Sequence, residues 1–361
     1  MEPISFARGV PAPECLPVDE LADCAAAVLA RDGRVVLSYG PAGGYAPLRE
    51  WIAERHGVDP GRVVLTNGSL EGFLFLARLL APRGPVLVEA PTYDRPLKIL
   101  ASLEAAVIAL PLDEEGLDVD ALADALESTT PSFLYTIPTF QNPSGRTLSV
   151  ERRERLAALA RERDLLVLED DPYSLVRFEG ESPPSVFELM DGEGVVYSSS
   201  FSKTVAPGLR VGYLVLPSEL APALEAAAAG AYITPVLLSQ ATVYEFLRRE
   251  MLERNLRRVC DLLRTRRDAM LDTLDEELPG AERTSPAGGY FVWLDLPDGL
   301  ATAELAAEGV TFVPGADFFP EGGGESAIRL AFSYVSPDEI GEGVRRLASA
   351  VRAGVSLRRS A

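Results

Sequence analysis

The chain of 361 residues contains one histidine, His56, and three cysteines. His56 directly precedes Gly57 at the expected end of a helix, so we interpret it as a C-terminal helix residue. No histidine then remains for a Ser-His-Asp triad or a histidine-rich metal site. The cysteines Cys15, Cys24 and Cys260 lack metal-ligand spacing, and a sparse, odd number is typical of a reducing compartment. We therefore expect no metal site and a cytoplasmic location.

Excess positive charge and long apolar runs are also missing. The formal net charge is −20, whereas a nucleic-acid-binding protein needs a basic patch to neutralise phosphates. The N-terminus has no apolar signal core, and no apolar run approaches the length that spans a bilayer. We therefore expect neither nucleic acid nor a membrane among the partners.

Lysine is almost absent, since the 34 basic residues include only Lys98 and Lys203. Lys98 lies on an expected helix with no phosphate motif nearby, and we interpret it as a solvated side chain. Lys203 follows an expected strand, directly after Ser200 and Ser202, and Arg210 comes seven residues later. Hydroxyl and guanidinium groups can anchor a phosphate, so Lys203 is the better candidate for an amine nucleophile.

Short apolar strands alternate with helical segments from Val63 onward, which predicts an α/β protein with a mainly parallel sheet between helices. Residues 236–274 have helical character without proline or glycine. Three further strands, at 289–296, 310–313 and 327–332, and a helix at 338–351 predict a smaller α+β domain. We expect three parts: an N-terminal segment packing with the small domain (1–30), a large domain (31–236), and a connecting helix with the small domain (237–361).

Polar motifs follow the predicted strands. Ser69 begins a helix directly after a strand and a glycine, which is typical of an anion site. Tyr93, Asn142 and Asp170 also follow strands, and Asp170 has an acidic neighbour, Asp171. Ligands of parallel sheets bind beyond the carboxyl ends of the strands, so we expect these residues to lie near Lys203.

The string from Tyr197 to Tyr213, which contains Lys203, resembles the lysine motif of the fold-type I, class I and II aminotransferases. Within that family the chain looks most like the 2-aminoadipate aminotransferase branch, and the other motifs recur in order over nearly the whole chain. The resemblance implies a pyridoxal-phosphate (PLP) enzyme that holds its cofactor as a Schiff base on Lys203. It would move the amino group of an L-amino acid to a 2-oxo acid, with 2-oxoglutarate as the expected acceptor.

The resemblance also implies how the cofactor is held. Lys203, Asp170 and Tyr173 would be catalytic, with Asp170 at the ring nitrogen and Tyr173 and Asn142 at the ring oxygen. Tyr93 would stack on the ring. The phosphate would be held by Ser69, the backbone of Leu70 and Glu71, Ser200, Ser202, Arg210 and, from the neighbouring subunit, Tyr39. A homodimer with shared active sites is therefore implied.

The resemblance further assigns the substrate carboxylate to Arg329, with Asn142 and Gly9 beside it. The amino-acid substrate is open between apolar, aromatic and acidic side chains. Arg8 stands where relatives often have glycine, and either contacts an acidic substrate group or projects into solvent. Relatives carry a helix upstream of the Gly9 motif that helps to recognise the substrate side chain, whereas this chain begins almost at that motif, so dicarboxylate selectivity stays open.

Two alternatives remain at this point. The first is another PLP reaction on the same scaffold, a β-lyase or an amino-acid cyclase of secondary metabolism, because a fold fixes cofactor binding more firmly than reaction outcome. The second is a ligand-sensing domain like those fused to winged helices in transcription regulators. A net charge of −20 disfavours the second alternative.

Overall fold

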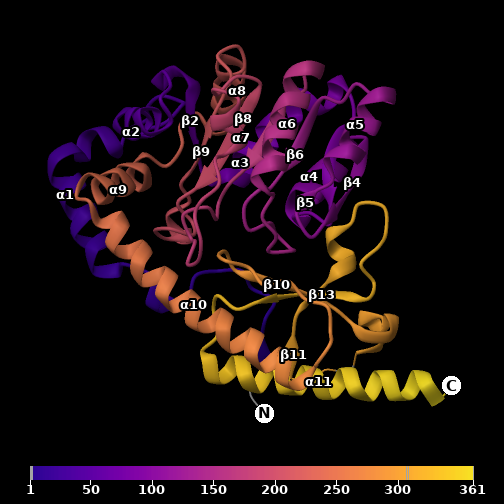
Figure 1. The fold of residues 1–361 in the computed structure, drawn as a ribbon. Coiled ribbons are helices and arrows are strands. Elements are labelled where there is room, and N and C mark those ends of the chain that lie inside the picture. Colours follow the sequence, from indigo (N-terminus) through magenta and orange to yellow (C-terminus); the bar gives the residue numbers. More distant parts are fainter. Residues whose placement is uncertain (1–2, 306, 308, 361) are drawn as a thin grey trace.

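The computed structural model describes residues 3–305, 307 and 309–360, and in this part of the chain the largest sheet has eight strands (Figure 1). Their order is β2-β9-β8-β7-β6-β3-β4-β5. The strands are β2 (Val63–Thr66), β3 (Val86–Ala90), β4 (Val107–Asp113), β5 (Gly116–Leu117), β6 (Phe133–Thr136), β7 (Val167–Asp170), β8 (Val195–Ser200) and β9 (Gly212–Val215). The five consecutive strands β8-β7-β6-β3-β4 pair in parallel. Strands β9 and β5 are antiparallel to their neighbours. The predicted α/β class with a mainly parallel sheet is confirmed.

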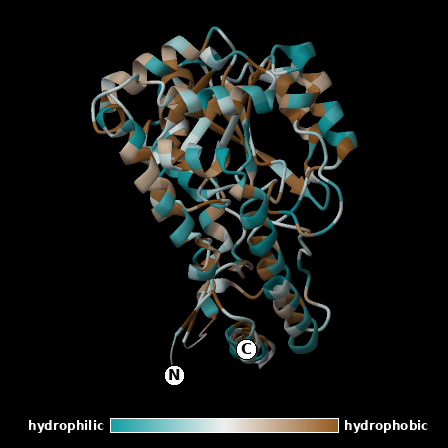
Figure 2. Cartoon of the chain, turned by 90° about the vertical axis from the view of Figure 1, so that its left-hand side faces the viewer, coloured by the Kyte–Doolittle hydropathy of each residue, from teal (hydrophilic) through white to brown (hydrophobic). Residues whose placement is uncertain are grey.

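Helices cover both faces of this sheet. One face packs on α1 (Val18–Val36), α2 (Ala46–His56), α5 (Val119–Ser128), α6 (Val150–Arg163), α7 (Val186–Leu189) and α9 (Leu237–Arg248). The other face packs on α3 (Ser69–Leu80), α4 (Asp94–Ser102) and α8 (Ala221–Tyr232). In Figure 2 hydrophobic residues gather on the inner strands, while hydrophilic residues are frequent on the outer helices.

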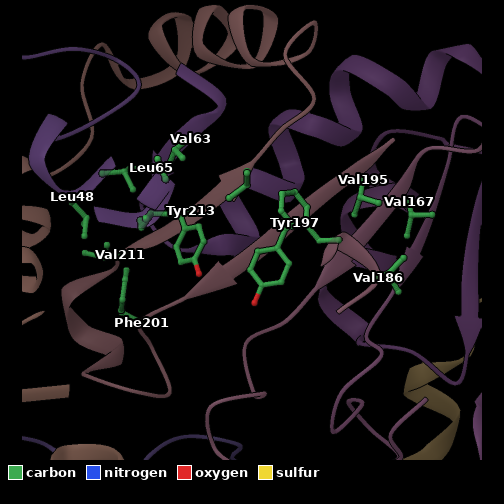
Figure 3. Close-up of a cluster of buried hydrophobic side chains, with 14 of the residues drawn as sticks. Leu48, Val63, Leu65, Val167, Val186, Val195, Tyr197, Phe201, Val211 and Tyr213 are labelled. Atoms are coloured by element: carbon green, nitrogen blue, oxygen red, sulfur yellow. The ribbon is translucent and has the colours of Figure 1, made fainter. Parts of the chain in front are cut away.

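Alternation along each strand divides the side chains between two cores. Val195 and Tyr197 of β8 lie in the first core, shown in Figure 3, whereas Val196 lies in the second. The central strands are therefore apolar on both faces, which explains why their sequences do not alternate between polar and apolar residues.

The smaller sheet lies beyond the carboxyl ends of the large one (Figure 1). Its strands β10 (Phe291–Asp295), β13 (Ala327–Ala331) and β12 (Val313–Pro314) pair antiparallel in that order. A separate parallel pair joins β1 (Ile4–Ser5) to β11 (Val310–Thr311), so the predicted strand at 310–313 is divided between two partners. Helices α10 (Met251–Glu277) and α11 (Pro337–Ser360) pack together against this part.

The prediction of one helix over residues 236–274 is wrong, because the chain breaks between α9 and α10. Glu250 has a positive φ of 56°, and the preceding arginines, Arg248 and Arg249, both donate to the buried carboxylate of Glu245. Helix α9 packs in the large core and most of α10 in the small one. The break lets each helix turn its apolar face toward a different core.

The expected boundary at residue 30 is also wrong. Ile4, Phe6 and Cys15 lie in the small core, but α1 packs against α9 with Cys24 and Val28 in the large core. We propose that the N-terminal segment of the small domain ends near Pro17, and that α1 and α9 belong to the large domain. Residues 1–2, 306, 308 and 361 of the expected ranges lie outside the described residues.

Among the helices that the structure describes, none combines the length and the apolar character needed to cross a membrane.

Candidate active site

A cavity of about 290 Å³ opens at the carboxyl ends of β2, β3, β6, β7 and β8. Many of the predicted site residues line it: Gly9, Ser69, Leu70, Tyr93, Asn142, Asp170, Tyr173, Ser200, Ser202, Lys203 and Arg210. Residues that were not predicted complete the lining: Val10, Phe73, Pro96, Tyr135, Ile137, Pro172, Ser198 and Pro207. A wider hollow of about 710 Å³ beside Arg146 and Arg283 contains none of the predicted residues, so the smaller cavity is the candidate site.

Lys203 follows β8 and extends toward the N-terminal segment. Its Nζ donates to the backbone oxygen of Gly9 at 2.7 Å and lies 5.1 Å from the ring centre of Tyr290. Burial, together with the positive charges of Arg329 and Arg210, lowers the pKa of Lys203 to about 8. A larger fraction of this amine is therefore neutral near pH 7 than for an ordinary lysine, and the neutral form is the nucleophile and base.

Asp170 ends β7 and turns its carboxylate to the cavity. Tyr135 donates its hydroxyl to Oδ2 at 2.8 Å, and Ser198 donates to Oδ1 at 3.1 Å. Burial raises the pKa of Asp170 to about 6, against the effect of the two hydrogen bonds. Within residues 3–305, 307 and 309–360, no cationic side chain forms an ion pair with Asp170. The carboxylate is thus suited to a cationic ligand group.

The neighbouring Asp171 points away from this cavity. Its carboxylate accepts hydrogen bonds from the Tyr197 hydroxyl at 2.7 Å and from the Ser174 backbone at 2.9 Å. It lines a different hollow, beside His56. The structure therefore separates two aspartates that are adjacent in the sequence.

One end of the cavity has groups that bind anions. Gly68, with φ of 94°, leads into the N-terminus of α3, and a Cβ at this position would lie 2.2 Å from Nη2 of Arg210. The same Nη2 donates to the Asn67 oxygen at 3.1 Å. Ser200 donates to Ser202 at 2.7 Å on the other side. Helix amides, hydroxyls and a guanidinium together suit a phosphate.

Glu71 lies outside the cavity lining, although its backbone belongs to the first turn of α3. Its carboxylate accepts a hydrogen bond from the Asn67 backbone at 2.8 Å. The side chain of Glu71 therefore holds the turn that leads into the helix.

Arg329 of β13 reaches the site from the small sheet. Its Nη1 donates to Asn142 Oδ1 at 2.8 Å and its Nη2 to the Ala7 oxygen at 2.8 Å. The guanidinium lies 4.3 Å from the ring centre of Phe291 and 4.9 Å from that of Phe318. Its Nε is buried without a hydrogen-bond partner among the described residues. Such a group has capacity left for a carboxylate ligand.

Gly9 permits a close approach between the N-terminal segment and β10. A Cβ on Gly9 would lie 2.4 Å from the ring of Phe291. A larger residue would displace that ring, the backbone that accepts from Lys203, or both.

A second group of buried residues that the sequence analysis missed supports the site. Glu89, at the end of β3, is only 2% exposed and accepts hydrogen bonds from the Ile137 backbone at 3.1 Å and from Gln141 at 2.9 Å. Gln141 also donates to the Pro91 oxygen at 2.7 Å. Glu89 thereby joins the turn that carries Tyr93 to the turn that carries Asn142. A charged residue at the end of an apolar strand was the available signal.

Two tyrosines complete the description. Burial and the nearby carboxylates of Asp94 and Asp170 raise the pKa of Tyr93 to about 12, so its hydroxyl stays protonated. Tyr39 is 80% exposed and lies outside the cavity lining.

The donor set fits pyridoxal phosphate. An anion site lies at one end, a carboxylate without a cationic partner among the described residues lies at the end of β7, and an amine of lowered pKa lines the same cavity. A phosphate, a pyridine nitrogen and an aldehyde are the three groups that such residues would bind.

Comparison with known proteins agrees with this fit. The sequence profile described as "Aminotransferase class I and II" matches residues 9–347. The chain belongs to the class I and II aminotransferases. The 2-aminoadipate transaminase of Thermus thermophilus is 42% identical to this aminotransferase, over 98% of this chain and 91% of that protein. The aromatic-amino-acid aminotransferase 1 of Thermococcus litoralis is 36% identical, over 97% of this chain and 88% of that protein.

Solved structures give the same result. The crystal structure of an α-aminoadipate aminotransferase of Thermus thermophilus, complexed with N-(5'-phosphopyridoxyl)-L-leucine, superimposes with a TM-score of 0.94 at 40% identity. The superposition covers 98% of this chain and 93% of that one. The predicted family, fold type, amino-group transfer and PLP cofactor of this aminotransferase are confirmed.

Proposed function

We propose that this aminotransferase moves the amino group of an L-amino acid with an acidic, apolar or aromatic side chain to 2-oxoglutarate. The observation that carries the proposal is a single cavity containing Lys203, Asp170 and Asn142, with Asn142 hydrogen-bonded to Arg329. The names of two relatives, an aminoadipate and an aromatic-amino-acid enzyme, and the leucine derivative bound in the solved structure, support this range of side chains.

The proposed roles follow from the geometry. The α3 N-terminus at Ser69, Leu70 and Glu71, with Ser200, Ser202 and Arg210, would hold the phosphate. Tyr93 would lie on the ring, and Asn142 and Tyr173 would contact the ring oxygen. Asp170 would hold a proton at the ring nitrogen.

Substrate would bind through its carboxylate to Arg329, beside Asn142 and Gly9. The bound cofactor supplies an electron sink for the negative charge that develops at the substrate α-carbon. The neutral Nζ of Lys203 would take the proton from that carbon and return it on the cofactor side. The lowered pKa of Lys203 suits this task, because a base must be partly deprotonated at the working pH.

A homodimer forms part of the proposal. Exposed apolar side chains lie on two segments of the chain: Val35, Leu37 and Tyr39 on one, and Ile233 and Val236 on the other. Two hydrogen bonds connect their segments to each other and to the site, from the Gly40 backbone to Thr234 and from the Val236 backbone to Asn67. A second copy that covers this patch would bring its Tyr39 to the phosphate. We also propose a cytoplasmic location, because all three cysteines are free thiols.

The test is the absorbance spectrum of the purified protein with PLP, before and after L-glutamate is added. We expect a cofactor band that requires Lys203 and that glutamate converts to the spectrum of pyridoxamine phosphate. Lys203→Ala should lack the band, whereas Lys98→Ala, which changes the exposed lysine on α4, should retain it. A Lys203-dependent band that glutamate leaves unchanged would contradict 2-oxoglutarate as the acceptor. A panel of 2-aminoadipate, leucine and phenylalanine would then define the donor.

A further inference from the structure

Two buried tyrosines hold the two adjacent aspartates at the end of β7. Tyr135 of β6 donates to Asp170 at 2.8 Å, and Tyr197 of β8 donates to Asp171 at 2.7 Å. Tyr135 lies in the core behind α3 and Tyr197 in the opposite core, where Figure 3 shows it beside Tyr213. The two hydrogen bonds are alike in length, but only Asp170 lines the cofactor cavity.

The hydroxyl of Tyr135 has a fixed position. The residue is 1% exposed, and its ring packs edge-on against Phe73 of α3 at 5.2 Å between ring centres. Burial and the charge of Asp170 raise the pKa of Tyr135 above its usual value, so the hydroxyl keeps its proton. The hydroxyl therefore remains a hydrogen-bond donor to Asp170 over the working pH range.

The hydrogen bond acts on the charge of Asp170. Desolvation favours the protonated acid, whereas hydroxyl donors favour the carboxylate, and Tyr135 is the stronger of the two donors. A protonated Asp170 could not hold a proton at a pyridine nitrogen by charge, and a rotated carboxylate would present the wrong oxygen. Oδ2 accepts from Tyr135 and Oδ1 from Ser198, which fixes the carboxylate plane.

We propose that Tyr135 is a positioning residue that keeps the Asp170 carboxylate ionised and oriented toward the ring nitrogen of the cofactor. The inference rests on the proposed placement of that nitrogen at Asp170. Tyr135 does not follow from the family motifs, which assign Asp170 but not its hydrogen-bond donor on the neighbouring strand.

The experiment compares Tyr135→Phe with Tyr197→Phe. Each variant removes one hydroxyl from a buried tyrosine–aspartate pair, so the cost in thermal stability of the cofactor-free protein should be similar. The dissociation constant of PLP, measured by titration of the cofactor-free protein, should rise about tenfold in Tyr135→Phe and less than about twofold in Tyr197→Phe. The acidic limb of the kcat profile should move up by about one pH unit in Tyr135→Phe alone, so that raising the pH restores part of its activity.

The inference is overturned if Tyr135→Phe binds PLP as tightly as the unmodified protein, or if both variants weaken binding equally. Asp170→Asn separates this failure from a failure of the proposed site. If Asp170→Asn weakens PLP binding and Tyr135→Phe does not, only the role of Tyr135 is wrong. If Asp170→Asn also binds PLP normally, the placement of the ring nitrogen is wrong, and the inference falls with it.

Discussion

The buried amine of Lys203 should make the cofactor-free protein less stable than an uncharged side chain at the same position would. Burial lowers the pKa of Lys203 from 10.5 to about 8, and this difference corresponds to about 3 kcal/mol of destabilisation while the folded amine is charged. Because Lys203 lines an open cavity, water screens part of this cost, and about 2 kcal/mol is the expected net effect. Lys203→Met keeps an unbranched side chain, one atom shorter, and removes the charge. We therefore expect Lys203→Met to be more stable than the unmodified protein by that amount at pH 7.

The pH dependence follows from the sign of the shift. A lowered folded pKa means that the folded state releases the proton first as the pH rises. The cost is present in full below about pH 8 and disappears as the pH approaches 10.5. The stability difference between Lys203→Met and the unmodified protein should therefore shrink from pH 7 to pH 10.

Urea unfolding of the cofactor-free proteins at several pH values measures both effects. The matched control is Lys98→Met, because Lys98 is the other lysine, its side chain is 60% exposed, and it pairs with Asp94 at 2.7 Å on the surface of α4. Its free energy of unfolding should change by less than about 1 kcal/mol. A Lys203→Met protein no more stable than the unmodified one at pH 7, or a difference that is constant with pH, would refute the reasoning.

Two further predictions concern buried ionisable groups. Burial lowers the pKa of His56 to about 4, and because His56 is the single histidine, its ring can be followed by NMR without assignment. The ring of the folded protein should titrate with a midpoint near 4, and the stability that depends on the neutral ring should fall as the pH drops from about 6.5 to 4. A midpoint near 6.5 would contradict the structure. Glu89→Gln should raise the KM for the amino acid several-fold, because it displaces the turn that carries Asn142. The control is Glu169→Gln, which changes a carboxylate of similar burial that caps α7; it should lower the thermal midpoint and leave KM within about twofold. Equal changes in KM would exclude a positioning role for Glu89.

The sequence predicts best those elements that combine a hydrophobic pattern with residues that mark where the element begins and ends. Helix α6, for example, begins and ends on local signals, because the Ser149 side chain accepts from the Arg152 backbone and Asp164 ends the helix in the left-handed region. The motif residues meet in one cavity for a topological reason. Parallel strands end at the same edge of a sheet, so residues such as Asn142 and Lys203, 61 positions apart in sequence, line the same space.

Elements whose boundaries depend on distant contacts were not predictable. No residue around Glu250 is a typical helix breaker. The break arises because α9 packs in the large core and most of α10 packs in the small core. The same holds for the strand at 310–313, which divides because β11 pairs with the N-terminal β1 and β12 with β13. In both cases tertiary packing overrides a locally continuous pattern.

The choice between Asp170 and Asp171 shows what the fold adds to a motif. Alternation along β7 requires that two adjacent side chains face opposite sides of the sheet, so the sequence alone predicts that one of them leaves the site. Which of the two aspartates remains in the site depends on the face of the sheet that α3, the helix after β2, covers. That face is set by how the connection from β2 crosses the sheet. Helix α3 covers the face that contains Tyr135, and its N-terminus opens on the side of Asp170. The same crossing therefore selects the aspartate, places the anion site beside it, and supplies the tyrosine that donates to it.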